Sequence, residues 1–210
     1  MNGLRNNLSD QNQHSIGDEI TKVLIFVGVI WAVFFLDLFL PLSEWFALVP
    51  WSVNRLPGIV AMTFLHKDLG HILANTVPLI VLMTLLAGSR ANSWTTVAAL
   101  IVVGGSLLWL FGRNGDDSLV ISHIGASLLV FSLVTFFLAA AWFEKRLVPM
   151  LIAALVGFLY GGSTLMGVIP TGSGVSWDGH LCGAVAGVIV ALMQPMLISS
   201  GSSRSELDQL

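Results

Sequence analysis

Long runs of apolar residues without a charged side chain recur along the chain, and short polar segments separate them. A helix needs about 20 apolar residues to cross the hydrocarbon of a bilayer, because no water is present there to satisfy the backbone polar groups. Runs of that length extend from Ile20 to about Leu40 and between the charged residues Asp68 and Arg90, Arg90 and Arg113, Asp117 and Glu144, Arg146 and Asp178, and Asp178 and Arg204. The pattern predicts an all-α, polytopic membrane protein with six transmembrane helices.

Both ends of the chain are polar. Residues 1–19 are rich in Asn, Gln, Ser and Asp, a composition that cannot bury a core, so we expect this segment to be disordered. Its polarity also argues against a cleaved signal peptide, and the run from Ile20 to Leu40 is expected to be retained as a signal anchor. Residues 199–210 form a second, shorter polar tail. The predicted membrane domain therefore covers residues 20–198.

The composition agrees with a membrane protein and excludes two other classes of protein. Hydrophobic residues make up 55% of the chain and charged residues only 10%, whereas soluble domains carry about 25% charged residues. The 9 Lys and Arg residues are scattered and are outnumbered by 12 Asp and Glu residues, so no nucleic-acid partner is expected. The chain has one cysteine, Cys182, which excludes an internal disulfide and a multi-cysteine metal site.

Basic residues are unequally divided between the two sides of the predicted membrane domain. With six spans, one side holds Arg5, Lys22, Arg90, Lys145, Arg146 and Arg204, and the other holds Arg55, Lys67 and Arg113. Because loops rich in Lys and Arg stay in the cytoplasm, we predict that both termini are cytoplasmic. The lack of a recognisable transit peptide favours a plasma membrane of the bacterial type.

Polar residues gather at the starts of the second, fourth and sixth predicted helices, which all enter the membrane from the outer side. His71 and Asn75 lie on the second helix, Ser127 on the fourth and His180 on the sixth. All four lie in the first turns of their helices and therefore at a similar depth. Ionisable and amide groups at that depth are costly unless they share a wet cavity, so a functional site is expected there.

These residue types fit nucleophilic catalysis by a serine and a histidine. A serine hydroxyl is inert at neutral pH until an adjacent imidazole removes its proton, and the tetrahedral intermediate needs hydrogen-bond donors aimed at its oxygen. Ser127 is the candidate nucleophile and His180 the candidate general base. His71 and Asn75 are four residues apart and share a helix face, so both can hold the oxyanion together with the backbone N–H of Ser127.

Small residues follow His180 along one face of the sixth predicted helix. Gly183, Ala184 and Gly187 lie three, four and seven residues after it. Faces of this kind let transmembrane helices approach closely, so they can bring the imidazole within reach of a serine on a neighbouring helix.

Three motifs at these positions resemble those of the rhomboid family of intramembrane serine proteases. They are FLHKDLGHILANTVPL at Phe64–Leu79, HIGAS at His123–Ser127 and GVSWDGHLCGAVAG at Gly174–Gly187. They follow the family's order, and the resemblance covers about residues 50–192. It implies a rhomboid-like six-helix bundle in which Ser127 is the nucleophile, His180 the base, and His71 and Asn75 the groups at the oxyanion. It also implies that Phe131 stacks on the histidine, with Gly125, Gly183 and Gly187 supporting the site.

The resemblance further implies an endopeptidase that cleaves transmembrane protein substrates near the extracytoplasmic face, in contact with membrane lipids. A substrate helix would enter sideways from the bilayer and unwind, because a helical backbone hides its scissile carbonyl in its own hydrogen bonds. No metal and no organic cofactor is expected, since His66 and His71 lack the acidic partners and the spacing of a zinc-protease helix.

The chain departs from the family pattern directly after the serine. Leu128 stands where the family has glycine, and Ser132 occupies another position that is often glycine. The extra volume of Leu128 between two closely packed helices is expected to be accommodated by a shift, at roughly 1–3 kcal/mol, that alters the distance from Ser127 to His180. One alternative is therefore a catalytically inactive rhomboid-like protein that binds transmembrane clients. Another is a transporter or proton-coupled channel that uses His71, His123 and His180 as relays.

Other polar residues near the motifs have structural interpretations. His66 is expected to close the loop before the second helix by hydrogen bonding. His123 lies four residues before Ser127, but Gly125 between them is expected to break the helix, so His123 is not the expected base. Asp178 is two residues from His180 and points in another direction, which favours a cap on the sixth helix. Cys182 is expected to be a packing residue.

Overall fold

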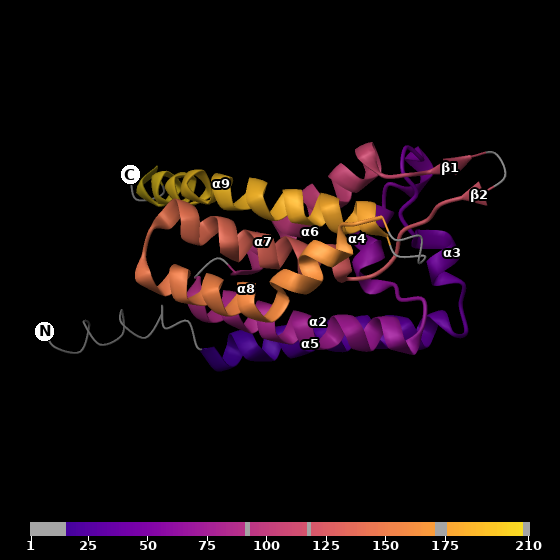
Figure 1. Cartoon of the computed structure of the whole chain (residues 1–210), viewed down its shortest axis with the longest axis horizontal. Helices are drawn as coiled ribbons and strands as arrows, with labels where there is room; N and C mark the ends of the chain where they lie inside the picture. The colour runs from indigo at the N-terminus through magenta and orange to yellow at the C-terminus, as the bar shows by residue number, and fades with distance from the viewer. Residues whose placement is uncertain (1–15, 91–92, 117–118, 171–175, 208–210) are drawn as a thin grey trace, which may run out of the picture.

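The computed structural model describes residues 16–90, 93–116, 119–170 and 176–207. Its long helices are α2 (Ile16–Asp37), α5 (Leu69–Ser89), α6 (Ser93–Phe111), α7 (Ser127–Glu144), α8 (Leu147–Gly167) and α9 (Trp177–Leu207), which form a bundle (Figure 1). Among the described residues, six helices are long and apolar enough to cross a membrane. The predicted six-span helical fold is confirmed, and the protein is a multi-pass integral membrane protein.

Short elements cover one end of the bundle. The segment between α2 and α5 holds α3 (Leu42–Phe46), the 3₁₀ turns η2 (Val53–Arg55) and η3 (Met62–Phe64), and α4 (Gly58–Ala61). Between α6 and α7, the strands β1 (Gly115–Asp116) and β2 (Leu119–Val120) pair antiparallel. The α3 helix and both strands lie at the end opposite the start of α2 and the end of α9 (Figure 1). Helices α5, α7 and α9 therefore all begin at the end that these short elements cover.

The first membrane helix begins earlier than the sequence predicts. Helix α2 starts at Ile16 and includes Glu19, which is buried. The Glu19 carboxylate accepts hydrogen bonds from Ser93 Oγ (2.9 Å), Trp94 Nε1 (2.9 Å) and Lys22 Nζ (2.7 Å). The helix therefore begins before Ile20, the start that the sequence predicts. A buried Glu19 is possible within it because these donors satisfy its carboxylate. The rest of the predicted N-terminal segment, residues 1–15, lies outside the described residues.

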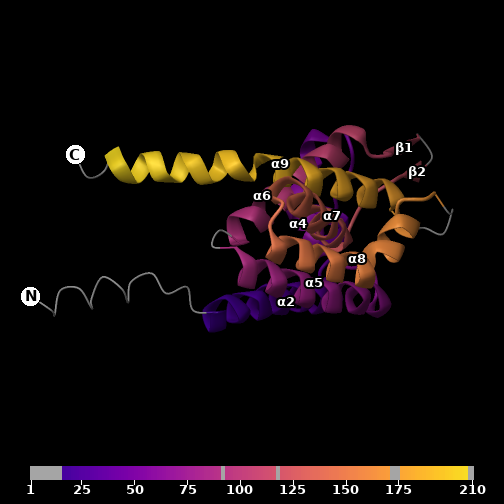
Figure 2. The same cartoon turned by 60° about the vertical axis from the view of Figure 1, so that its left-hand side comes forward.

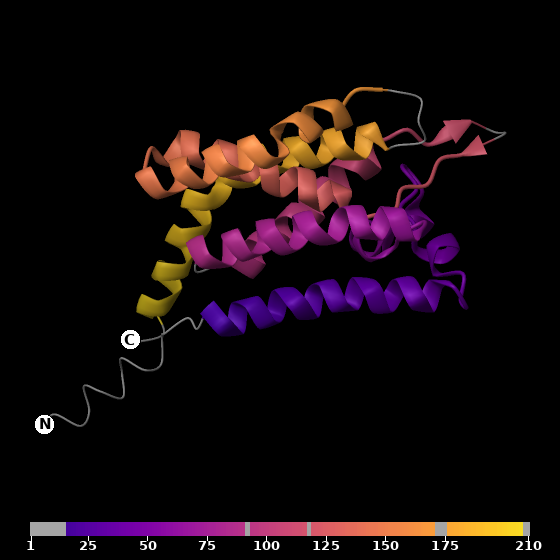
Figure 3. The same ribbon diagram turned by 60° about the horizontal axis from the view of Figure 1, so that its bottom comes forward.

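Helix α7 is the centre of the bundle. Figure 2 shows it surrounded by α5, α6, α8 and α9, and its apolar core includes the fully buried side chains of Leu129, Leu133 and Phe136. Helix α2 lies at the edge and packs on α5 (Figure 3). Helix α8 leaves most of its surface exposed, including Phe158, and this apolar surface is suited to contact with lipid. The residue that begins α7 is therefore held by several elements at once.

Glycines bring α9 close to α7, as the sequence predicts. A Cβ atom on Gly183 would lie 3.2 Å from Leu128 Cα, and one on Gly187 would lie 2.8 Å from the backbone nitrogen of Phe136. Thr135 Oγ1 on α7 also donates a hydrogen bond to the Ala184 carbonyl on α9 (2.8 Å). Only helices without side chains at these two positions can pack this closely, so the contact sets the distance between α7 and α9 along the stretch that follows His180.

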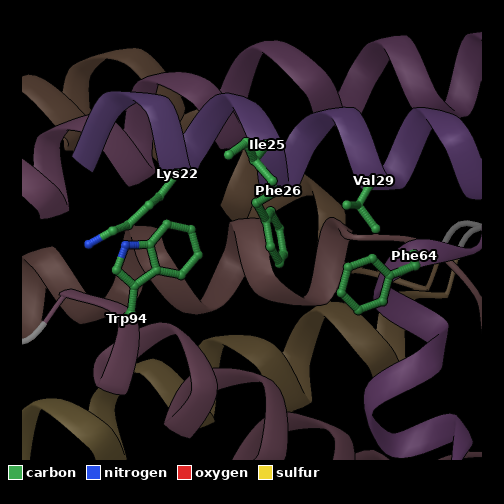
Figure 4. A pocket seen from close by; sticks show the side chains of 6 residues that line it. All are labelled: Lys22, Ile25, Phe26, Val29, Phe64 and Trp94. Carbon is green, nitrogen blue, oxygen red and sulfur yellow. The ribbon is translucent and has the colours of Figure 1, made fainter. Parts of the chain in front are cut away.

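A groove of about 390 Å³ lies between α2, α6 and η3 (Figure 4). The residues that line it are Lys22, Ile25, Phe26, Val29, Phe64 and Trp94. Its lining is apolar except for the lysine, whose ammonium is paired with Glu19 at 2.7 Å. None of the predicted catalytic or oxyanion residues lines this groove, so it is separate from the site described next.

Candidate active site

Ser127 and His180 are brought together at the covered end of the bundle. Ser127 is the first residue of α7, and His180 lies in the first turn of α9. The distance between Ser127 Oγ and His180 Nε2 is 3.0 Å. Both side chains are therefore in hydrogen-bond contact, as the sequence predicts for a nucleophile and its base.

Two contacts fix the protonation and the orientation of the His180 ring. His180 Nδ1 lies 2.9 Å from the Gly167 carbonyl oxygen. Because a carbonyl can only accept, Nδ1 carries the proton, and Nε2 of the neutral ring is free to accept from the Ser127 hydroxyl. Phe131 stacks on the ring with a centroid distance of 4.0 Å and an interplanar angle of 10°, which is the stacking that the resemblance implies.

Gly167, at the end of α8, is a site residue that the sequence analysis missed. A Cβ atom here would lie 2.8 Å from Phe131 Cε1 and 3.1 Å from His180 Nδ1. Only glycine leaves room for the stacked rings while its carbonyl binds the imidazole. A backbone carbonyl has no side-chain signal, and the one hint in the sequence is a glycine at the end of an apolar run.

A turn at Gly125 presents Ser127. Gly125 has φ +118°, a conformation that favours glycine, and a Cβ atom there would lie 2.6 Å from His71 Nε2. The Gly125 N–H donates to the Met62 carbonyl (2.8 Å), and the Ala126 N–H donates to His66 Nε2 (3.4 Å). The break in the helix before Ser127 is confirmed. The His66 bond reaches the turn before α7, whereas the predicted role was to close the loop before α5.

His71 and Asn75 lie beside this turn. The His71 ring packs against Gly125 and beside the His66 ring, with a centroid distance of 5.1 Å. Asn75 is buried, and its Nδ2 donates to the His71 carbonyl (3.0 Å). Asp68 caps α5 by accepting from the His71 N–H (2.8 Å), a bond that lowers the pKa of the Asp68 carboxyl. The cap fixes the first turn of α5, which carries His71, and Asn75 follows one turn later on the same helix.

Leu128 does not push the dyad apart. Its side chain points to α6, where a Cβ atom on Gly104 would lie only 2.6 Å from Leu128 Cδ2. Ser132, the other departure from the family pattern, is fully buried and donates its hydroxyl to the Leu128 carbonyl (2.8 Å). With Leu128 in place, Ser127 and His180 are within hydrogen-bond distance, because Gly104 provides the space that the leucine needs.

Comparison with known proteins now gives the family. A family model described as the Rhomboid domain matches residues 50–195. The chain belongs to the rhomboid family. An uncharacterized protein of Mycobacterium tuberculosis is 39% identical over 148 residues, 69% of this rhomboid and 61% of that protein. An uncharacterized protein of Mycobacterium leprae is 40% identical over 140 residues, 65% of this chain and 55% of its own. A putative rhomboid protein of Acanthamoeba polyphaga mimivirus is 27% identical over 136 residues, 64% of this chain and 72% of its own.

The matched regions cover less than two thirds of the length of the mycobacterial relatives. In this rhomboid, the matched residues 50–195 contain every residue of the site described above.

Asp178 has a different role from the predicted one. It is the second residue of α9, and its carboxylate binds the backbone N–H (2.9 Å) and the guanidinium (3.1 Å) of Arg113. The cap of α9 is Ser176, whose Oγ accepts from the Gly179 N–H (3.2 Å). The prediction of Asp178 as the cap is wrong, because the helix begins one residue before it.

Cys182 packs among apolar residues, as predicted. Among the described residues, no group of three or more His, Cys, Asp or Glu side chains could hold a metal ion.

The buried His66 predicts a pH dependence of the rhomboid's stability. Burial, followed by the nearby His71, lowers the pKa of His66 from 6.5 to about 4. As the pH falls from 6.5 to about 4, His66 becomes protonated in the unfolded chain but stays neutral in the folded chain. The free energy of unfolding therefore falls over this range. We expect a smaller fall in His66→Gln, whose amide oxygen can accept the Ala126 N–H without titrating. Thermal unfolding in detergent over this range measures the difference, and parallel curves would contradict the assignment.

Proposed function

We propose that this rhomboid is an intramembrane serine endopeptidase that cleaves transmembrane protein substrates through Ser127 and His180. The observation that carries the proposal is the 3.0 Å contact between Ser127 Oγ and His180 Nε2, in a ring whose Nδ1 is bonded to the Gly167 carbonyl at 2.9 Å. A serine in a membrane helix ordinarily bonds to its own backbone. This one instead faces the acceptor nitrogen of an imidazole that a second contact has oriented.

The reaction follows from this arrangement. Ser127 Oγ attacks the scissile carbonyl carbon as its proton passes to His180 Nε2. The peptide C–N bond then breaks, His180 returns the proton to the leaving amine, and the acyl group stays on Ser127. Water, activated by the same nitrogen, hydrolyses the ester. Throughout, the Gly167 carbonyl holds the Nδ1 proton and stabilises the imidazolium that forms twice in each cycle.

The oxyanion is held by groups from α5 and from the start of α7. The amide of Asn75 carries two N–H donors, of which its own helix uses one at the His71 carbonyl, so the second can bind the oxyanion. The His71 ring, packed on Gly125, supplies another donor. The Ser127 backbone N–H, at the positive end of the α7 dipole, supplies a third.

The site's place in the bundle suggests where cleavage occurs. Helices α5, α7 and α9 begin at the end opposite the start of α2 (Figure 1). With the termini in the cytoplasm of a cell with a bacterial-type plasma membrane, the site opens near the extracytoplasmic face. A substrate helix arrives from the lipid and unwinds there, because its scissile carbonyl must leave the helical hydrogen bonds before the serine can attack. No cofactor takes part in this chemistry.

Labelling with a fluorophosphonate probe tests the proposal. The probe reacts with an activated serine, so the purified protein in detergent should carry it on Ser127, located by mass spectrometry, and Ser127→Ala should not react. Ser132→Ala is the matched control, because that serine is also on α7 but bonds to the Leu128 carbonyl, and it should react like the wild type. A wild type that stays unlabelled, or a Ser127→Ala variant that still reacts, would refute the proposal in favour of a rhomboid that binds transmembrane clients without cleaving them.

A further inference from the structure

His123 lies outside the dyad but contacts the segments that carry both of its members. It is buried, and its backbone forms two hydrogen bonds with Leu48, from N–H to carbonyl in each direction (2.8 and 3.1 Å). The Gly125 turn separates it from Ser127. Its ring nitrogens face other elements: Nδ1 lies 2.8 Å from Ser176 Oγ, and Nε2 lies 3.1 Å from the Arg113 carbonyl.

Ser176 is bonded directly to the first turn of α9. Its Oγ accepts from the Gly179 N–H (3.2 Å), and its carbonyl accepts from the His180 N–H (3.0 Å). The path from the His123 ring to the backbone of His180 thus runs through one residue. The loop that presents Ser127 and the helix start that presents His180 are connected at this point.

The hydrogen-bond partners of His123 indicate which of its ring nitrogens carries the proton. The Arg113 carbonyl can only accept, so His123 Nε2 carries the proton, and Nδ1 is an acceptor facing the Ser176 hydroxyl, whose oxygen also lies 3.2 Å from Asp178 Oδ1. Burial lowers the pKa of His123, which keeps the ring neutral at pH 7. The charged groups that face it are Arg113 and Asp178, which bind each other at 3.1 Å, with the Asp178 carboxylate 3.7 Å from His123 Nε2.

We propose that His123 is a positioning residue that, through its Nδ1 bond to Ser176, sets the separation of Ser127 and His180. This inference rests on the proposed serine–histidine mechanism. The bond fixes the start of α9 against the loop before α7, at the end where the dyad forms. The contacts of Gly183 and Gly187 fix the distance between α9 and α7 beyond the first turn of α9. The first turns of the two helices are held by the loops that precede them.

Two amide substitutions of His123 distinguish the role of Nδ1 from that of Nε2. In His123→Asn the amide lies at the place of Nδ1 and can accept from Ser176, whereas in His123→Gln it lies at the place of Nε2 and can reach only the Arg113 carbonyl. We expect His123→Asn to react with the fluorophosphonate probe within about threefold of the wild-type rate. His123→Gln and His123→Ala should react about tenfold more slowly, since sub-ångström misplacement of a reacting pair is costly. A role in packing alone would affect the two amide variants alike.

A second measurement does not depend on activity. The chain contains 5 histidines, so protein labelled with ¹⁵N-histidine gives few ring signals, and the His180 Nε2 resonance can be assigned by its loss in His180→Ala. The His180 Nε2 resonance should keep its wild-type chemical shift in His123→Asn. In His123→Gln it should move toward the chemical shift that it has in Ser127→Ala, where the bond between Ser127 and His180 is absent. An unchanged resonance in His123→Gln, or equal probe rates in the two amide variants, would overturn the inference while leaving the protease proposal intact. An unlabelled wild type that shows the expected resonances would refute the protease proposal and leave the connection standing.

Discussion

Cleavage of a transmembrane substrate is expected to fall by roughly a thousand-fold or more when His180 is replaced by alanine or asparagine. The reason is the loss of Nε2, the atom 3.0 Å from Ser127 Oγ that takes the hydroxyl proton in the proposed mechanism. Without that acceptor the serine remains a neutral alcohol, which is a weak nucleophile. Gel analysis of a reporter substrate in proteoliposomes measures the rate.

The His180→Asn variant distinguishes the loss of the base from a loss of packing around it. Its amide nitrogen lies at the place of Nδ1 and can still donate to the Gly167 carbonyl, so α8 and α9 stay joined, but no atom reaches Ser127. We therefore expect His180→Asn to unfold at nearly the wild-type temperature and to be as inactive as His180→Ala. If His180→Asn cleaved at a rate near that of the wild type, His180 would not be the base, and another group would have to take the proton.

The fold and the contact between Ser127 and His180 could be predicted because both leave a signal in residue types. Apolar runs of sufficient length identify the six spans, since the bilayer sets the length of each helix. Ser127 and His180 could be paired from the chemistry that each side chain offers and from their equal depth. Phe131 could be placed on His180 from the motif, and the stacked rings confirm it.

The parts that could not be predicted depend on backbone groups and on space. The bond from His180 to the Gly167 carbonyl uses no side chain of Gly167. The position of the Leu128 side chain depends on Gly104 of another helix, so volume at one position could not be judged without the other. Ser176 rather than Asp178 caps α9 because of where the helix begins, and sequence alone locates helix ends only to within a residue or two.

Gly183→Ala is expected to lower the rate of probe labelling about a hundred-fold. A Cβ atom at this position would lie 3.1 Å from the Leu128 carbonyl carbon and 3.2 Å from Leu128 Cα. These are backbone atoms in a helix and cannot move aside alone, so α9 must shift away from α7 and carry His180 with it. A displacement of about 1 Å between reacting groups costs on the order of a hundred-fold in rate. The labelling rate in detergent, measured beside the thermal unfolding midpoint, tests the expectation.

Two other glycines provide matched controls. Gly161 on α8 has no atom within 4 Å of the added Cβ, so Gly161→Ala should label like the wild type and unfold at the same or a higher temperature. The three atoms nearest to a Cβ on Gly104 belong to the side chains of Leu128 and Ala186, with Leu128 Cδ2 closest at 2.6 Å. Gly104→Ala should therefore slow labelling, and trimming the leucine in Gly104→Ala/Leu128→Ala should restore it. The same trimming should not rescue Gly183→Ala, because the backbone it meets is unchanged. Rescue there, or wild-type labelling of Gly183→Ala alone, would show that the close approach of α7 and α9 does not set the dyad distance.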